Sequence, residues 1–249
     1  MDTEVTKTLL TVNQTLATVL QTSLSGSYIA MEDGTGQFSI TYSTPPANNP
    51  SNAANEGIKQ TLCLWEVESV QTIYSKECIK CNCIMDSNNS GSSTFMNQTR
   101  LMNKTYVVGY CYGEPNGLNN VNPIGAVLVF SPGENTGVAI TPTLNTPIII
   151  GGSSVYCSFS TPEGNKPNIY RNWYGLALGS SITNDGRQKW IAKRYCDESM
   201  TNNKATAYFD NVPLSLGQTY CFAFGYNPGR DIGNPSVGMY HVFTAESAT

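Results

Sequence analysis

Tyr220-Cys221-Phe222-Ala223-Phe224-Gly225-Tyr226 is the stretch that decides the fold. Aromatic side chains occupy every second position, and small residues stand between them. Because successive side chains of a strand point to opposite faces of a sheet, this alternation predicts a strand whose aromatic rings enter a core. The small side chains, Cys221 included, are expected on an outward face.

Composition extends this prediction to the whole chain. Only 13% of the 249 residues are charged, whereas Thr, Ser, Asn, Gly and the 14 tyrosines are abundant, which favours sheets and turns. A net charge of -4 and a pI near 5.0 provide no basic surface for a phosphate backbone, so we do not expect a nucleic-acid partner. No apolar run approaches the roughly 18 to 20 residues that cross a bilayer, so we do not expect membrane insertion.

The chain repeats itself at an offset of about 114 residues, which indicates two related units. The matching positions are Phe95 and Phe209, Met102 and Leu216, Asn103 and Gly217, Thr105 and Thr219, Tyr106 and Tyr220, and Tyr112 and Tyr226. Upstream, Phe38–Pro45 matches Val155–Pro162, and Trp65 matches Trp173.

Each copy contains short alternating segments separated by Pro, Gly and Asn clusters, which is typical of a β-sandwich. We therefore predict an all-β fold of two tandem sandwiches behind a short arm. The expected boundaries are 1–26 for the arm, 27–132 for the first sandwich, 132–137 for a linker, and 138–249 for the second sandwich.

The approach to the decisive strand, residues 212–220, resembles the tyrosine corner of immunoglobulin-like and fibronectin type III domains. The first copy has the similar stretch Met102-Asn103-Lys104-Thr105-Tyr106. The stretch Asn172–Leu178, which contains Trp173, also resembles the Trp-containing strand of SKICH-type immunoglobulin-like domains. The resemblance implies two tandem immunoglobulin-like sandwiches and names no function.

The N-terminal arm has a pattern of its own. Its spaced apolar residues would lie on one seam of a coiled coil; they are Val5, Leu9, Val12, Leu16 and Val19. Abundant threonine disfavours a helix, and the apolar alternation equally allows an extended strand donated to a neighbouring subunit. A helix, a donated or swapped strand and a flexible terminus all stay open here, and the first two predict self-association.

The eight cysteines predict disulfide bonds, because a cytosolic protein without a metal seldom keeps so many. The first copy holds an odd number and so does the second, so full oxidation requires a bridge between the copies or between chains. The outward position expected for Cys221 favours a surface or inter-subunit bridge there. The candidates, for which no pairing is assigned, are Cys63, Cys78, Cys81, Cys83, Cys111, Cys157, Cys196 and Cys221.

The stretch Cys78-Ile79-Lys80-Cys81-Asn82-Cys83 also has a spacing that zinc sites use, since thiolates two or three residues apart bind one tetrahedral ion. No second pair has a matching spacing, so a fourth ligand would have to come from Cys63 or Cys111. We favour a disulfide-rich turn and expect neither a metal nor another cofactor.

Residues suited to catalysis are few. The sole histidine, His241, lies in an alternating segment, where a histidine more often faces outward than acts as a base. Asp197 and Glu198 are adjacent, and neighbours on a strand point to opposite faces, which does not suit a pair of glycosidase acids. We therefore expect a protein that is not an enzyme and has no catalytic residues.

Together these patterns predict a structural subunit of an extracellular or virion-surface filament or fibre, in which the arm joins copies and disulfides lock them. The alternative is an adhesin or carbohydrate-binding module that contacts a cell-surface glycan or another surface protein through loops such as Pro45–Gly57 and Pro162–Ile169. A reduced intracellular protein with free or zinc-bound thiols is a third hypothesis. The sequence contains no recognisable signal peptide, although its cysteines favour an oxidising destination. Synthesis in the cytosol followed by release to a virion or spore surface reconciles the two observations, and a leader that has been removed is the alternative.

Overall fold

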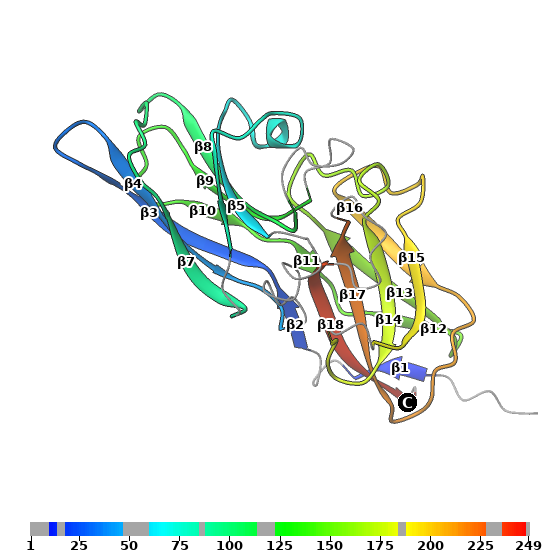
Figure 1. Ribbon diagram of the computed structural model, residues 1–249. Coiled ribbons are helices and arrows are strands. Elements are labelled where there is room, and N and C mark those ends of the chain that lie inside the picture. The colour runs from blue at the N-terminus through cyan, green and yellow to red at the C-terminus, as the bar shows by residue number, and fades with distance from the viewer. Residues whose placement is uncertain are drawn as a thin grey trace, which may run out of the picture.

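The computed structural model describes residues 10–13, 18–46, 60–84, 88–113, 123–183, 188–227 and 236–247. The chain is all-β, as predicted, and its antiparallel strands form two halves that lie next to each other (Figure 1). Within the described residues the one helical element is the short 3₁₀ helix η2 (Val70–Tyr74).

The first half consists of two antiparallel sheets packed face to face. One sheet has the order β10 (Val138–Ile140), β9 (Ile124–Phe130), β8 (Thr105–Cys111), β5 (Thr61–Val67) and β6 (Lys80–Cys83). The other has the order β3 (Ser23–Ala30), β4 (Gly36–Ser43) and β7 (Ser90–Phe95). Phe38 joins them in the core, because its ring centroid lies 5.0 Å from that of Phe130 and 5.6 Å from that of Tyr106.

The second half has the same arrangement. One sheet has the order β18 (Ser236–Ser247), β17 (Thr219–Tyr226), β14 (Trp173–Leu178) and β15 (Trp190–Tyr195), and β1 (Leu10–Val12) and β2 (Thr18–Gln21) pair with the free side of β18. In the other, β13 (Ser154–Ser160) pairs with β16 (Lys204–Phe209) on one side and with β11 (Thr143–Leu144) and β12 (Ile148–Ile150) on the other. The aromatic face of β17 enters this core as predicted, since the ring of Phe224 lies 4.4 Å from that of Phe159.

The tyrosine-corner contact occurs in both halves. The Tyr106 hydroxyl accepts a hydrogen bond from the backbone N–H of Leu101 at 3.0 Å. The Tyr220 hydroxyl accepts the equivalent bond from the N–H of Ser215 at 2.7 Å. The sequence repeat therefore corresponds to a repeated local structure, which by itself identifies no family.

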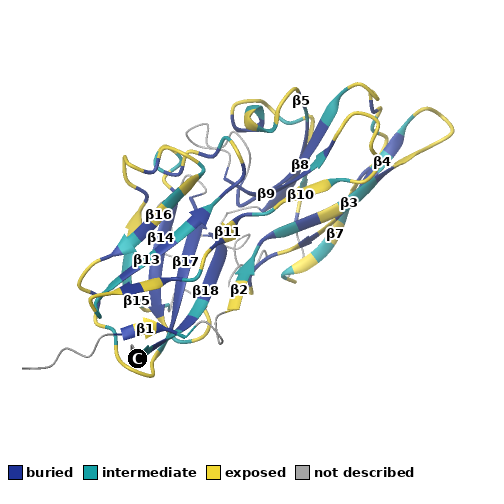
Figure 2. Ribbon diagram, turned by 180° about the vertical axis from the view of Figure 1, so that it is seen from behind, coloured by how far each residue is buried: buried dark blue, intermediate teal, exposed yellow. Residues whose placement is uncertain are grey.

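The second face of β17 is buried, and the prediction of an outward Cys221 is wrong. Cys221 and Ala223 are fully buried in one apolar cluster with Trp173 and Tyr240. Every residue of β17 after Thr219 is buried, and the strand is accordingly mostly dark blue in Figure 2. The alternation separated the two faces correctly, but it contained no sign that the second face has its own apolar cover. Cys221 offers no surface for a bridge in the folded chain.

Residues 132–137, predicted as a linker, instead form the turn of the β9–β10 hairpin. This turn is held against β3, because the Asn135 carbonyl accepts a hydrogen bond from the Tyr28 N–H at 2.7 Å and the Gly137 N–H donates to the Gly26 carbonyl at 3.1 Å. The chain leaves the first half at residues 141–142, between β10 and β11.

The two halves meet at a stacked pair of equivalent tyrosines. The ring centroids of Tyr112 and Tyr226 are 5.2 Å apart, with an interplanar angle of 9°. Each ring also requires a glycine beside it: a Cβ on Gly125 would lie 2.3 Å from the Tyr112 ring, and a Cβ on Gly238 would lie 2.2 Å from the Tyr226 ring. The Tyr226 hydroxyl donates a hydrogen bond to the Gly125 carbonyl at 3.3 Å, which ties the halves together.

A second contact between the halves involves η2. The rings of Tyr74 and Tyr170 stack with centroids 5.5 Å apart, and the Gln71 amide donates a hydrogen bond to the Glu163 carboxylate at 2.5 Å. Both contacts join residues that are far apart in sequence. The halves are therefore packed against each other through side chains, in addition to being connected by the chain.

Candidate assembly site

The N-terminal arm forms two short strands on the edge of β18. In β1, Leu10 pairs with Ser247 and Val12 with Ala245. In β2, Val19 pairs with His241. The coiled-coil alternative is therefore wrong for the described part of the arm, which forms strands that pair within the same chain. Donation of the strand to a neighbouring subunit stays a prediction. Of the predicted seam, Val5, Leu9 and Leu16 lie outside the described residues.

The two arm strands differ in how firmly they are anchored. Leu10 and Val12 are 8% and 9% exposed and belong to the main core of the protein, where β1 contacts β12 as well as β18. Val19 is 39% exposed, so the seam predicted from the spacing is split between core and surface. The Asn13 N–H donates a hydrogen bond to the Thr244 carbonyl at 3.0 Å, which continues the pairing beyond β1.

A single residue, Thr22, carries the chain from the second half into the first. It follows β2 directly, precedes β3 directly, and is completely buried. Its backbone N–H and its hydroxyl both donate to the Gly238 carbonyl at 3.0 Å, and its hydroxyl also hydrogen-bonds with that of Tyr112. The crossing is thus fixed beside the stacked tyrosines.

The arm occupies the same position on the second half that β10 occupies on the first. Ile140 of β10 pairs with Val127 of β9, and Leu20 of β2 pairs with Tyr240, the residue of β18 that corresponds to Val127 in the repeat. After these pairs, β10 leads into β11 of the second half and β2 leads into β3 of the first half. Each half therefore places the strand that precedes it on the edge of the other half.

The sequence contained a weak signal for this reciprocal exchange. At an offset of about 120 residues, Leu20 aligns with Ile140, and Leu24 aligns with Leu144. Leu24 and Leu144 are both buried, at 4% and 3% exposed. The intervening Thr, Ser, Gln and Pro residues do not match, because they lie where the two crossings differ. The repeat predicted from sequence began downstream, at Phe38.

The cysteines divide into one disulfide and six free thiols. Cys63 and Cys81 are bonded, and the Cys78 sulfur lies 2.8 Å from that of Cys81. Among the free thiols only Cys83 is exposed; Cys111, Cys157, Cys196 and Cys221 are buried. Burial raises the pKa of the Cys221 thiol to about 12, so it stays protonated and is a poor nucleophile at neutral pH.

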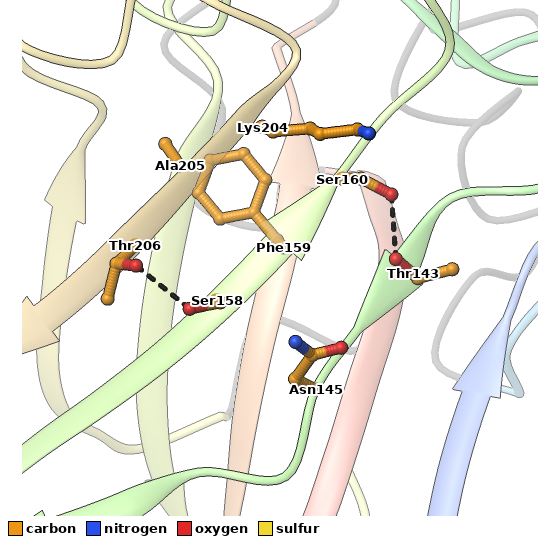
Figure 3. A pocket seen from close by; sticks show the side chains of 8 residues that line it. All are labelled: Thr143, Asn145, Ser158, Phe159, Ser160, Lys204, Ala205 and Thr206. Atoms are coloured by element: carbon orange, nitrogen blue, oxygen red, sulfur yellow. Dashed lines mark hydrogen bonds between the residues drawn. The ribbon is translucent and has the colours of Figure 1, made fainter.

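A polar groove of about 480 Å³ lies over β11, β13 and β16 (Figure 3). Pairs of hydroxyl groups line it: Ser158 lies 2.8 Å from Thr206, and Thr143 lies 2.7 Å from Ser160. A smaller pocket of about 220 Å³ includes Glu163 and Lys166 from the predicted loop Pro162–Ile169. The other predicted loop, Pro45–Gly57, lies outside the described residues from 47 onward.

Of the residues considered for catalysis, His241 pairs with Val19 of β2 and lies next to the backbone of Leu144 and Asn145. It is 2% exposed and shares the inward face of β18 with Met239 and Phe243, whereas an outward position was predicted. Asp197 accepts hydrogen bonds from the N–H and the hydroxyl of Ser199, as a carboxylate in a surface turn does. This arrangement gives Asp197 a structural role in the turn.

No protein-family model and no curated protein matches this sequence. Among the described residues there is no helix with the length and apolar character needed to span a membrane. The geometry of the chain is therefore the basis for its proposed function.

Truncation of Leu10 tests how the arm is anchored. Leu10→Ala removes a buried side chain at the β1–β18 edge, and we expect the free energy of unfolding to fall by about 2–3 kcal/mol. The matched control, Val19→Ala on the more exposed β2, is expected to change it by no more than about 0.5 kcal/mol. Urea denaturation measures the free energy of unfolding of both variants. Equal decreases in the two variants would contradict the stronger anchoring of β1.

Burial lowers the pKa of His241 below its ordinary value of 6.5, and the backbone groups of Leu144 and Asn145 partly offset this. The unfolded chain therefore binds a proton at a higher pH than the folded chain does. We expect the free energy of unfolding to decrease as pH falls below about 6.5, by at most about 1.4 kcal/mol per pH unit, until the folded pKa is reached. His241→Gln should remove this component from denaturation curves recorded between about pH 8 and pH 5; parallel wild-type and variant profiles would contradict it.

Proposed function

We propose that the protein is a structural subunit of an extracellular or virion-surface fibre, in which copies join by placing β1 and β2 on β18 of a neighbouring copy. The observation that carries this proposal is the equivalence of β2 and β10, each of which covers the edge of one half and leads into the other. Within one chain the exchange is reciprocal and closed. Between chains the same exchange is head-to-tail and open, which is the geometry that generates fibres.

The pairing itself needs no new contact in the fibre. Leu10 and Val12 would enter the core of the neighbour at the place where they enter their own, and the hydrogen bonds of Thr22 to Gly238 would form in the same way. Exchange of identical elements between copies is a low-cost route to assembly for this reason. Because Thr22 keeps its contacts, the path of the chain would change at the other crossing, residues 141–142 between β10 and β11.

The edge of β18 must be covered in either state. This strand is 12 residues long, and an unpaired edge of that length presents a row of backbone N–H and C=O groups to other chains. Several of its inward side chains, including Met239 and Phe243, are fully buried. A copy whose arm is displaced is therefore expected to accept the arm of another copy.

An adhesive or carbohydrate-binding role is the second candidate. The rings of Tyr156 and Tyr208 stack with centroids 5.8 Å apart, and they lie in register with the hydroxyl pair of Ser158 and Thr206 on β13 and β16. Aromatic rings beside hydroxyl groups suit a sugar. This candidate places the binding surface on a sheet face, whereas the sequence suggested the loops at the ends of the sandwich.

Cross-linking at a known register distinguishes exchange between chains from pairing within a chain. Thr11 pairs with Glu246, so a chain with Thr11→Cys and a second chain with Glu246→Cys would form a bridge only across two copies. We expect peptide mapping of a mixture that has been unfolded and refolded together under oxidising conditions to recover this bridge, and electron microscopy of the wild type to show fibres.

The matched control replaces Glu246→Cys with Ser92→Cys, an exposed position on β7 that the arm does not pair with. It should give no bridge to position 11. If the bridge forms only when both substitutions are in one chain, the arm stays in its own molecule and the proposed fibre is wrong.

Covalent joining of copies in pairs is expected at Cys83, the one exposed free thiol among the described residues, because one thiol per chain can link two chains at most. Natively sourced protein on a denaturing gel without reductant should give a dimer band at about twice the mass of the 27.0 kDa chain, and reductant should convert it to the monomer. Cys83→Ser should abolish the dimer band, whereas Cys221→Ser, at a buried thiol, should keep it. A single monomer band without reductant would contradict an intermolecular disulfide at Cys83.

A further inference from the structure

All five cysteines of the first half lie on, or next to, one face of one sheet. Cys63 on β5 pairs with Cys81 on β6, so the two side chains share a face. Thr61, two residues from Cys63 and therefore on the same face, pairs with Cys83 on one side and Cys111 on the other. Cys78 lies in the turn that leads into β6, close to Cys81.

Three of these sulfurs are close enough to bind a single ion. The Sγ atoms of Cys63, Cys78 and Cys81 all lie within 4.8 Å of one another. Four thiolates around a tetrahedral zinc ion, with Zn–S bonds of about 2.3 Å, stand roughly 3.8 Å apart, so these three sulfurs would need only small side-chain rotations once the disulfide is reduced. The cluster contains sulfur ligands alone, which favours a thiophilic ion such as zinc over magnesium or calcium.

Cys111 is the residue placed to complete the set. It is fully buried in the same apolar cluster as Cys63, Cys78 and Cys81, and Thr61 hydrogen-bonds with it and with Cys63. Cys83 is at the exposed edge of β6 and is outside that cluster. The apolar cover from Trp65, Ile73 and Tyr74 shields the inner side of the cluster from water.

We propose that the reduced chain binds one zinc ion through Cys63, Cys78, Cys81 and Cys111, and that the Cys63–Cys81 disulfide is the oxidised form of the same site. The site does not depend on the proposed fibre, because it uses no residue of the arm or of β18. The zinc site also assigns a role to Cys78. The disulfide uses Cys81 and leaves Cys78 free, whereas the zinc site uses both.

The conversion between the two forms requires an oxidant, and a small-molecule disulfide such as oxidised glutathione is sufficient. The Cys63 and Cys81 thiolates lose two electrons and form the S–S bond. The S–S bond of glutathione accepts these two electrons, breaks, and takes up two protons to give two glutathione thiols. Zinc loses two of its four ligands and dissociates.

Cobalt(II) substitution in the full-length, reduced chain under anaerobic conditions tests the site. We expect one cobalt per chain, visible bands of tetrahedral coordination, and a sulfur-to-cobalt charge-transfer band with the intensity of four thiolates. Cys78→Ala and Cys111→Ala each leave three thiolates, so each should weaken binding and lower the charge-transfer intensity per bound cobalt by about one quarter. Cys83→Ala and the second-half control Cys221→Ala should leave the spectrum unchanged.

Several results would overturn the proposal. One is a reduced wild-type chain without a thiolate charge-transfer band, and another is an unchanged band in Cys78→Ala. An effect of Cys83→Ala but not of Cys111→Ala would overturn the assignment of the fourth ligand. Because the buried variant Cys111→Ala could fail to fold, Cys78→Ala, at a half-buried free thiol, decides the main question; circular dichroism confirms that it is folded.

A second readout follows the oxidation. Addition of oxidised glutathione to the zinc-loaded chain should release one zinc ion per chain, detected with a chromogenic chelator, and peptide mapping should then recover the Cys63–Cys81 bridge. Zinc release with a different bridge, or formation of this bridge with zinc retained, would show that the two forms do not share one site.

Discussion

The structure depends on one constraint: the edges of β9 and β18 must both be covered, and each is covered by the strand that leads into the other half. The crossings have to pass the place where the halves touch. The stacked rings of Tyr112 and Tyr226 occupy that place, and each needs a glycine beside it, at 125 and at 238. The glycines, the tyrosines and the buried Thr22 are therefore parts of one junction, in which no member can be enlarged without displacing another.

Much of the fold could be predicted from the sequence because its evidence is local. The alternation of β17 gave its core face, and the turn before Tyr220 gave a hydrogen bond that the repeat then placed at Tyr106 as well. The burial of Cys221 could not be predicted in the same way, because its cover comes from Trp173 and Tyr240 on neighbouring strands. Alternation distinguishes two faces of a strand and says nothing about what lies over either one.

The arm shows the limit of periodicity more clearly. Val12 and Val19 fit one helical seam, and the chain instead places Val12 in the core and leaves Val19 partly exposed on a second strand. Short apolar patterns with threonine between them suit both structures, and the unpaired edge of β18 decides between them. The cysteine cluster was predicted only in part for a related reason. The spacing of Cys78, Cys81 and Cys83 indicated a zinc site and left Cys63 or Cys111 as the fourth ligand. Cys63 and Cys111 join Cys78 and Cys81 only through the pairing of β5 with β6 and β8, which the spacing does not contain.

Whether the arm closes on its own chain or joins another is a question of competition, since the paired contacts are the same in both cases. Closure within a chain benefits from the high effective concentration of the arm, which the short path through Thr22 sets. For short connections this effective concentration is roughly in the millimolar range. Folding order works in the opposite direction. Among the described strands those of the arm come first and their acceptor β18 comes last, so during synthesis the arm is made before its own acceptor. In the proposed fibre, a completed neighbour with a free β18 edge would then capture the arm, which would give assembly a kinetic route even where the closed monomer is more stable.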